Sequence, residues 1–188
     1  MLLQAGTTEA ECQGWFTIAS APHEGTIHIS TRVSQSAFKQ ALNAMRPGDE
    51  IQSHSLEGDF TWEEISVVPV VVVAGGIGIT PYRSILLSRD VTGEPLNATL
   101  LYFNRTDEVP FRRELESLAA KHPEFALKVV VGEQVSADSI RRLAPQSSGQ
   151  IVFISGPEPM VEAIGSDLKD RGVEVKQDWF PGYDEKSY

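Results

Sequence analysis

The order of hydrophobic and polar positions divides the chain into two parts with different rhythms. Up to residue 66, short runs alternate between apolar and polar residues, and glycine and proline separate the runs. This alternation is typical of strands that bury one face, so it predicts an antiparallel β region. A helix is predicted at 36–45, where Pro47 and Gly48 end it. The alternating runs lie at 15–19, 26–33 and 50–52.

From residue 67 onward, wholly apolar runs alternate with amphipathic segments. Runs of Val, Ile and Leu indicate strands that are buried on both faces, as in a parallel sheet. We therefore expect an α/β fold with a doubly wound five-stranded parallel sheet in the order 3-2-1-4-5, joined to the first part at 59–67. The predicted strands lie at 67–74, 98–103, 125–131, 150–154 and 173–177, and the predicted helices at 81–88, 110–120, 137–143 and 157–171.

Charge and cysteine content narrow the classes of partner. The 188 residues carry a formal net charge of -10, which repels both nucleic acid and anionic membranes. Cys12 has no second cysteine to pair with, and the four histidines lack metal-ligand spacing, so no metal site is predicted. No apolar run reaches the ~18 residues that span a bilayer, and the N-terminus does not resemble a secretion signal. We expect a cytoplasmic protein without a membrane span.

A glycine-rich turn follows the first apolar strand directly. Gly75, Gly76 and Gly78 let the backbone turn sharply and approach a ligand closely. Thr80 suits the N-cap of the next helix, and Pro81 suits its first position. The free amides and the positive dipole of such a helix start favour an anion such as a pyrophosphate. The alternative is a tight turn that binds nothing.

A second small-residue turn follows the fourth predicted strand. It reads Ser155-Gly156-Pro157-Glu158-Pro159-Met160, again with proline at a helix start. In the order 3-2-1-4-5, the first and fourth strands are neighbours at the point where the winding direction reverses. Both turns are therefore predicted to face one crevice, which is where ligands bind in such sheets.

These two turns, together with Trp15-Phe16-Thr17-Ile18-Ala19-Ser20 upstream, resemble the motifs of the ferredoxin-NADP(H) reductase family. The resemblance covers about residues 14–183. It implies a partial FAD-binding β-barrel domain at 1–66 and an NAD(P)-binding domain at 67–188. It also implies an oxidoreductase that passes hydride from NAD(P)H to FAD, and then electrons to a separate protein or small molecule.

The resemblance also implies roles for individual residues. Phe16 would lie against the flavin ring, Thr17 would hydrogen-bond near the flavin nitrogen that receives hydride, and Ser36 would face the FAD pyrophosphate. Ser155 would stand beside the nicotinamide, so Thr17 and Ser155 are the predicted catalytic residues. Phe180 would shield the flavin, or else serve only as a packing anchor. The predicted cofactor-binding residues are Phe16, Thr17, Ser20, Ser36, Gly75, Gly76, Gly78, Thr80, Pro81, Asn104, Arg105, Gly156, Pro157, Met160 and Phe180.

The chain departs from the family's pattern at its front. Gly14 stands where the family has an arginine for the FAD phosphates, and losing that contact weakens binding by roughly 1.5 to 3 kcal/mol. Few residues precede the motif, so the first strands of the barrel are expected to be missing. Either a partner chain or a second copy completes the barrel, or the flavin binds weakly or not at all. The alternative function is a nucleotide-binding subunit or sensor without flavin, and a fragmentary reading frame is a third reading.

The choice of nucleotide depends on two loops. Arg105, after the second strand, could meet either an adenosine ribose or a 2′-phosphate. Glu133, after the third strand, would repel a phosphate and accept from a ribose hydroxyl, which favours NADH over NADPH. The alternative is that both are ordinary solvated loop residues.

Overall fold

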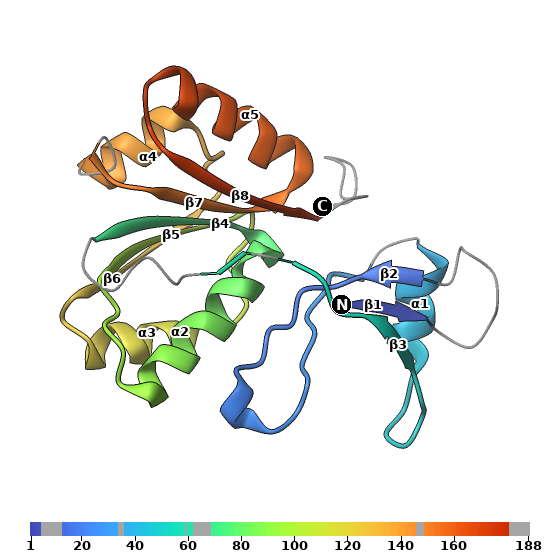
Figure 1. Cartoon of the computed structure of the whole chain (residues 1–188). Coiled ribbons are helices and arrows are strands. Elements are labelled where there is room, and N and C mark those ends of the chain that lie inside the picture. The colour runs from blue at the N-terminus through green and yellow to red at the C-terminus, as the bar shows by residue number, and fades with distance from the viewer. Residues whose placement is uncertain (5–12, 34–35, 59, 62–68, 146–148, 181–188) are drawn as a thin grey trace.

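The computed structural model describes most of the chain (Figure 1). Cys12, the start of the predicted strand at 67–74 and most of the predicted junction at 59–67 lie outside the described residues. Phe60, within the junction, packs edge-on against Tyr82 and Phe153, with ring centroids 5.7 and 5.8 Å apart. The described residues are 1–4, 13–33, 36–58, 60–61, 69–145 and 149–180.

A five-stranded parallel sheet forms the centre of the second part, as the apolar runs predicted. The strand order is β6-β5-β4-β7-β8, and every neighbouring pair is parallel. The central strand is buried along its whole length, which explains why its sequence is an unbroken apolar run. The strands are β4 (Val70–Gly75), β5 (Ala98–Asn104), β6 (Phe125–Val131), β7 (Val152–Pro157) and β8 (Val175–Phe180).

Helices cover both faces of this sheet (Figure 1). One core cluster joins Val70 and Val72 of β4 to α2 and α3, and the other joins Val71 and Val73 to α4 and α5. Alternate residues of one strand thus support opposite layers. The four predicted helices are confirmed as α2 (Thr80–Thr92), α3 (Arg112–Lys121), α4 (Ala137–Leu143) and α5 (Glu158–Asp170).

The first part of the chain contains a three-stranded antiparallel sheet with the order β2-β1-β3. Its small core consists of Leu3, Phe16 and Phe38, with Phe38 contributed by the helix predicted at 36–45. The elements are β1 (Leu2–Gln4), β2 (Gln13–Trp15), the 3₁₀ turn η2 (Pro22–Glu24), α1 (Ala37–Ala44) and β3 (Gln52–Ser55).

Three strand predictions in this part need correction. The run at 26–33 forms only one isolated bridge, from Ile29 to Ile18. The reason is that η2 and Gly25, at φ 68°, reverse the chain sharply before it, so Ile27 stays exposed. The run at 15–19 is a strand only at Trp15, and the run at 50–52 only at Gln52.

Within the described residues, no helix is both long enough and apolar enough to cross a bilayer.

Candidate functional site

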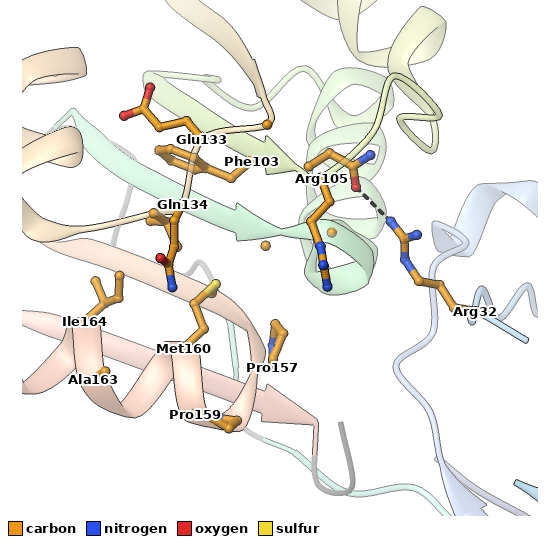
Figure 2. Close-up of a pocket in the computed structure, with 15 residues that line it drawn as sticks. Arg32, Phe103, Arg105, Glu133, Gln134, Pro157, Pro159, Met160, Ala163 and Ile164 are labelled. Atoms are coloured by element: carbon orange, nitrogen blue, oxygen red, sulfur yellow. Dashed lines mark hydrogen bonds between the residues drawn. The ribbon is translucent and has the colours of Figure 1, made fainter. Parts of the chain in front are cut away.

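A cleft of about 590 Å³ lies at the carboxyl ends of the central strands (Figure 2). Ligand sites in proteins commonly measure about 300–1,000 Å³, and this position is where doubly wound sheets bind their ligands. Six predicted residues line it: Gly75, Gly76, Asn104, Arg105, Pro157 and Met160. The rest of the lining is Arg32, Phe103, Gly132, Glu133, Gln134, Val135, Pro159, Ala163 and Ile164.

The glycine-rich turn runs from β4 into α2 through a short 3₁₀ helix, η3 (Gly76–Ile79). Gly76 has φ 54°, a conformation that L side chains rarely adopt. The N-cap prediction for Thr80 is wrong, because η3 continues directly into α2 and Thr80 is already helical. Its hydroxyl donates instead to the carbonyl of Ile77, at 3.1 Å.

The two predicted turns touch each other. A Cβ on Gly78 would lie 2.2 Å from the carbonyl oxygen of Ser155, and a Cβ on Gly75 would lie 2.5 Å from Sδ of Met160. Glycine at these two positions therefore allows the turn after β4 to pack against the turn after β7. Gly78, Thr80, Pro81, Ser155 and Gly156 are buried behind the cleft lining rather than on it.

Two arginines bring positive charge to the cleft. Figure 2 shows Arg105 pointing into it, while Arg32 approaches from the first part of the chain. Arg32 donates from Nη2 to Oδ1 of Asn104 at 2.8 Å. The side-chain nitrogen Nδ2 of Asn104 donates to the carbonyls of Thr106 and Glu108. Asn104 thus holds Arg32 and shapes the loop after β5. The Nε of Arg32 is buried without a hydrogen-bond partner among the described residues.

Sequence reasoning missed Arg32 as a site residue. It lies 72 residues before Asn104 in a run that reads as an ordinary strand, so no local signal links it to the nucleotide turns. The sequence offered only a weak hint: acidic residues outnumber basic ones, so few arginines and lysines are available to bind an anion.

Ser155 is fully buried, and its hydroxyl donates to Oδ2 of Asp178 on β8, at 3.0 Å. Asp178 was also missed, because the predicted strand at 173–177 ends one residue before it, whereas β8 continues to Phe180. Burial, with a smaller effect from the negative charge of Asp178, raises the pKa of Tyr82 well above its ordinary value. The Tyr82 hydroxyl donates to the carbonyl of Val73, at 3.3 Å.

The residues predicted to meet flavin lie in the first part of the chain. Phe16 is only 8% exposed and packs on Phe38, with ring centroids 5.5 Å apart. Thr17 is partly exposed, and Ser36 is exposed at the N-cap of α1 without a capping hydrogen bond from its side chain. Ser20 is buried, and its hydroxyl accepts from the amide of His28 at 2.9 Å.

Two further residues complete the comparison with the predicted flavin site. A Cβ on Gly14 would lie 2.9 Å from Cε2 of Phe16 and 3.2 Å from Cδ1 of Phe38. The packing of these rings therefore requires a residue as small as glycine where the family has arginine. Phe180 pairs with Pro157 through the backbone of β8, and its side chain lies outside the described part of the structure.

The sequence of this chain is similar to those of known oxidoreductases. The sequence profile described as "Oxidoreductase NAD-binding domain" matches residues 72–165. The chain is 28% identical over 155 residues to NADH-cytochrome b5 reductase 1 of Mortierella alpina, a match that covers 74% of this chain and 51% of that protein. It is 30% identical over 162 residues to ferredoxin--NADP reductase B of Sorangium cellulosum (strain So ce56), covering 81% and 66% respectively.

Solved structures share the same fold. A ferredoxin NADP+ reductase from Neisseria gonorrhoeae with bound FAD and NADP superposes with a TM-score of 0.73 at 17% identity, covering 95% of this chain and 84% of that one. The chain spans about half the length of the curated relatives that it matches.

Proposed function

Since this chain belongs to the oxidoreductase NAD-binding domain family, we propose that it binds a reduced nicotinamide dinucleotide across the cleft and delivers hydride from it to FAD. The resemblance to the ferredoxin-NADP(H) reductase family, which three motifs predicted, agrees with the relatives and with the fold. The electrons would then leave for a separate acceptor, either a protein or a small molecule.

The observation that carries this proposal is the convergence of both turns and two arginines on one cleft. The residues fit a dinucleotide diphosphate: Gly76 lets the backbone approach a ligand closely, and Arg32 and Arg105 contribute positive charge. A phosphate oxygen would also satisfy the buried Nε of Arg32, which has no partner among the described residues.

The residues of the first part fit FAD incompletely. Thr17 is partly exposed, and Ser36, at the start of α1, suits a phosphate contact. Phe16 offers little surface for stacking, because most of its ring is packed on Phe38. FAD, when bound, supplies the redox chemistry that accepts a hydride and releases electrons one or two at a time. In this proposal Thr17 remains the residue beside the flavin, whereas Ser155, which is fully buried, would support the nicotinamide site from behind the cleft lining.

A second function is favoured by the same packing. With Phe16 buried and Gly14 in place of the family's arginine, the chain could serve as a nucleotide-binding subunit or sensor that holds no flavin by itself. The cleft for the nicotinamide nucleotide does not depend on these two residues, so this alternative keeps the first half of the proposal.

NADH is the nucleotide that the cleft favours. Glu133 lines it beyond the end of β6 and pairs with Arg142, which supports this choice if the adenosine ribose lies against that loop. A carboxylate at this position accepts hydrogen bonds from a ribose hydroxyl and repels a phosphate. NADPH would bind more weakly.

The organisation of the chain follows from this function. We assign residues 1–66 to a partial FAD-binding β-barrel and residues 67–188 to the NAD(P)-binding domain. The antiparallel sheet β2-β1-β3 supports the first assignment. A partner chain or a second copy would complete the barrel, and a cytoplasmic location remains a prediction.

The test measures nucleotide and flavin separately. Calorimetric titration of the flavin-free protein with NADH and NADPH tests the cleft, and anaerobic addition of NADH after FAD loading and desalting tests the reductase through the flavin's visible absorption band. We expect NADH binding in the first experiment and bleaching in the second. NADH binding without retained FAD would support the subunit, and the absence of nucleotide binding would overturn both functions.

A further inference from the structure

Arg83, on α2, joins three separate segments of the chain. It is only 6% exposed. Its Nη1 and Nη2 donate to the two carboxylate oxygens of Glu24 at 2.8 and 3.0 Å, and its Nε and Nη2 donate to those of Glu114 at 2.7 and 2.9 Å. Nη1 also donates to the carbonyl of Ala19, at 2.6 Å. All five guanidinium N–H groups are thus used, in two fork-like pairs and one backbone contact.

Ser84, the next residue of α2, hydrogen-bonds to the same segment. The hydroxyl of Ser84 donates to the carbonyl of Ser20 at 2.7 Å, beside the contact from Arg83 to Ala19. Residues 19–24 therefore receive hydrogen bonds from two consecutive residues of one helix. Glu24 also caps this segment locally, since its Oε2 accepts from the amide of Ala21 at 2.7 Å.

The position of this contact gives it a role beyond stability. The segment 19–24 begins two residues after Thr17, and α2 begins immediately after the glycine-rich turn. Arg83 thus connects the residues proposed to meet flavin with the turn proposed to hold the nucleotide, over a short and buried path. On the other side, Glu114 of α3 and the ring of Phe111, with its centroid 5.0 Å from Cζ of Arg83, fix the guanidinium in place.

We infer that Arg83 is a positioning residue: it holds the Phe16–Ser20 segment at a fixed place relative to the nucleotide cleft and thereby sets the rate of hydride transfer. This inference rests on the proposed function. Hydride transfer requires the two reacting atoms at close contact, and a displacement of about 1 Å can slow such a step about a hundredfold. Arg83 does not line the nucleotide cleft, so we expect its conservative replacement to change nucleotide affinity little.

The two carboxylates allow the two sides of the contact to be cut separately. Glu24→Gln removes the charged link to the first part of the chain but keeps an oxygen for the Ala21 amide. Glu114→Gln removes the link within the nucleotide-binding domain. Arg83→Lys keeps the charge but loses the fork geometry. Arg112→Gln, which breaks the exposed pair with Glu116 on α3, is the matched control.

The experiment is stopped-flow reduction of protein-bound FAD by NADH, with near-ultraviolet circular dichroism and thermal unfolding to confirm that each variant folds. We expect Glu24→Gln and Arg83→Lys to lower the limiting rate about ten- to a hundredfold, with the NADH concentration for half-maximal rate unchanged within about twofold. We expect Glu114→Gln to lower the rate less and Arg112→Gln not to change it. A folded Glu24→Gln variant that matches the wild-type limiting rate would overturn the inference alone, whereas a wild-type protein that does not bleach FAD would overturn the proposed function and this inference with it.

Discussion

Ser155 and Asp178 occupy paired positions on the neighbouring strands β7 and β8, and the serine hydroxyl donates to the carboxylate at 3.0 Å. The serine is completely buried. Its carbonyl oxygen lies so close to Gly78 that no side chain fits between the two turns. The hydrogen bond therefore fixes a residue that stands between the edge strand of the sheet and the glycine-rich turn.

A double-mutant cycle measures what this hydrogen bond contributes. Ser155→Ala and Asp178→Ala should each lower the free energy of unfolding by about 1–3 kcal/mol, because each removes the hydrogen bond between the hydroxyl and the carboxylate. In the double variant the effects should be less than additive, with a coupling energy of about 0.5 kcal/mol or more. Urea unfolding followed by tryptophan fluorescence provides the values. Strict additivity would show that the two side chains act independently.

Gly78→Ala tests the contact between the two turns. The new Cβ would lie 2.2 Å from the carbonyl oxygen of Ser155, so one of the turns must move. We expect a loss of about 1–3 kcal/mol in the free energy of unfolding and weaker NADH binding by calorimetry. Gly149→Ala is the control, because nothing lies within 4 Å of its Cβ position. Equal stability of the two variants would contradict the described packing.

Arg32→Gln and Arg105→Gln test the proposed contact with the nucleotide phosphates. Each change should weaken NADH binding about ten- to a hundredfold, since a charge-assisted hydrogen bond contributes about 1.5–3 kcal/mol. The affinity of the wild-type protein should also fall with added salt more steeply than that of either variant. Arg46→Gln, on the exposed surface of the first part, should leave the affinity unchanged. An effect as large at Arg46 would indicate a general effect of net charge instead.

The sequence predicted the parallel sheet well, for a physical reason. Alternate residues of β4 support two different helical layers, so the strand is apolar at every position and stands out from the helices around it. The first part was harder to predict, since β1 is three residues long and one of its two partners, β3, lies far along the chain. Such pairing leaves no local pattern in the sequence.

The sequence identified the site residues whose backbone geometry requires a particular residue type, and it missed those that reach the site only through tertiary contacts. Gly76 and Gly78 are visible as a glycine-rich turn after a strand, because close approach of two turns requires the absence of side chains. Arg32 and Asp178 reach the site only through folding, across 72 and 23 residues from their partners. Phe16 is recognisable as part of a motif, but only the structure shows that Phe38 covers its ring.

The contact between Glu24 and Arg83 should make stability depend on pH in the acidic range. Hydrogen bonds from Arg83 and from the Ala21 amide lower the pKa of Glu24 to about 2, from an ordinary value of 4.5. Its contribution to stability is therefore complete above pH 4.5, falls as the pH is lowered toward 2 and is absent below that.

Melting temperatures of the wild-type protein and of Glu24→Gln, measured from pH 7 down to pH 2, isolate this contribution. The difference between the two proteins should be largest at neutral pH and should shrink below about pH 4.5. Other carboxylates with lowered pKa values, such as Asp90 and Asp138, are present in both proteins and cancel in the difference. A difference that stays constant over the whole range would mean that Glu24 does not titrate as its contacts imply.

Glu133 should decide which nucleotide the cleft prefers. In Glu133→Gln the carboxylate that repels a 2′-phosphate is gone, and Arg142 loses the partner with which it is paired. NADPH affinity should therefore rise, while NADH loses an acceptor for its ribose hydroxyl, and we expect the ratio of the two dissociation constants to shift about tenfold or more toward NADPH. Glu116→Gln is the matched control, because Glu116 is paired with Arg112 in the same way but lies on α3, outside the cleft lining. If calorimetry gives the same ratio for the wild-type protein and for Glu133→Gln, the adenosine end of the nucleotide does not lie against the loop that follows β6.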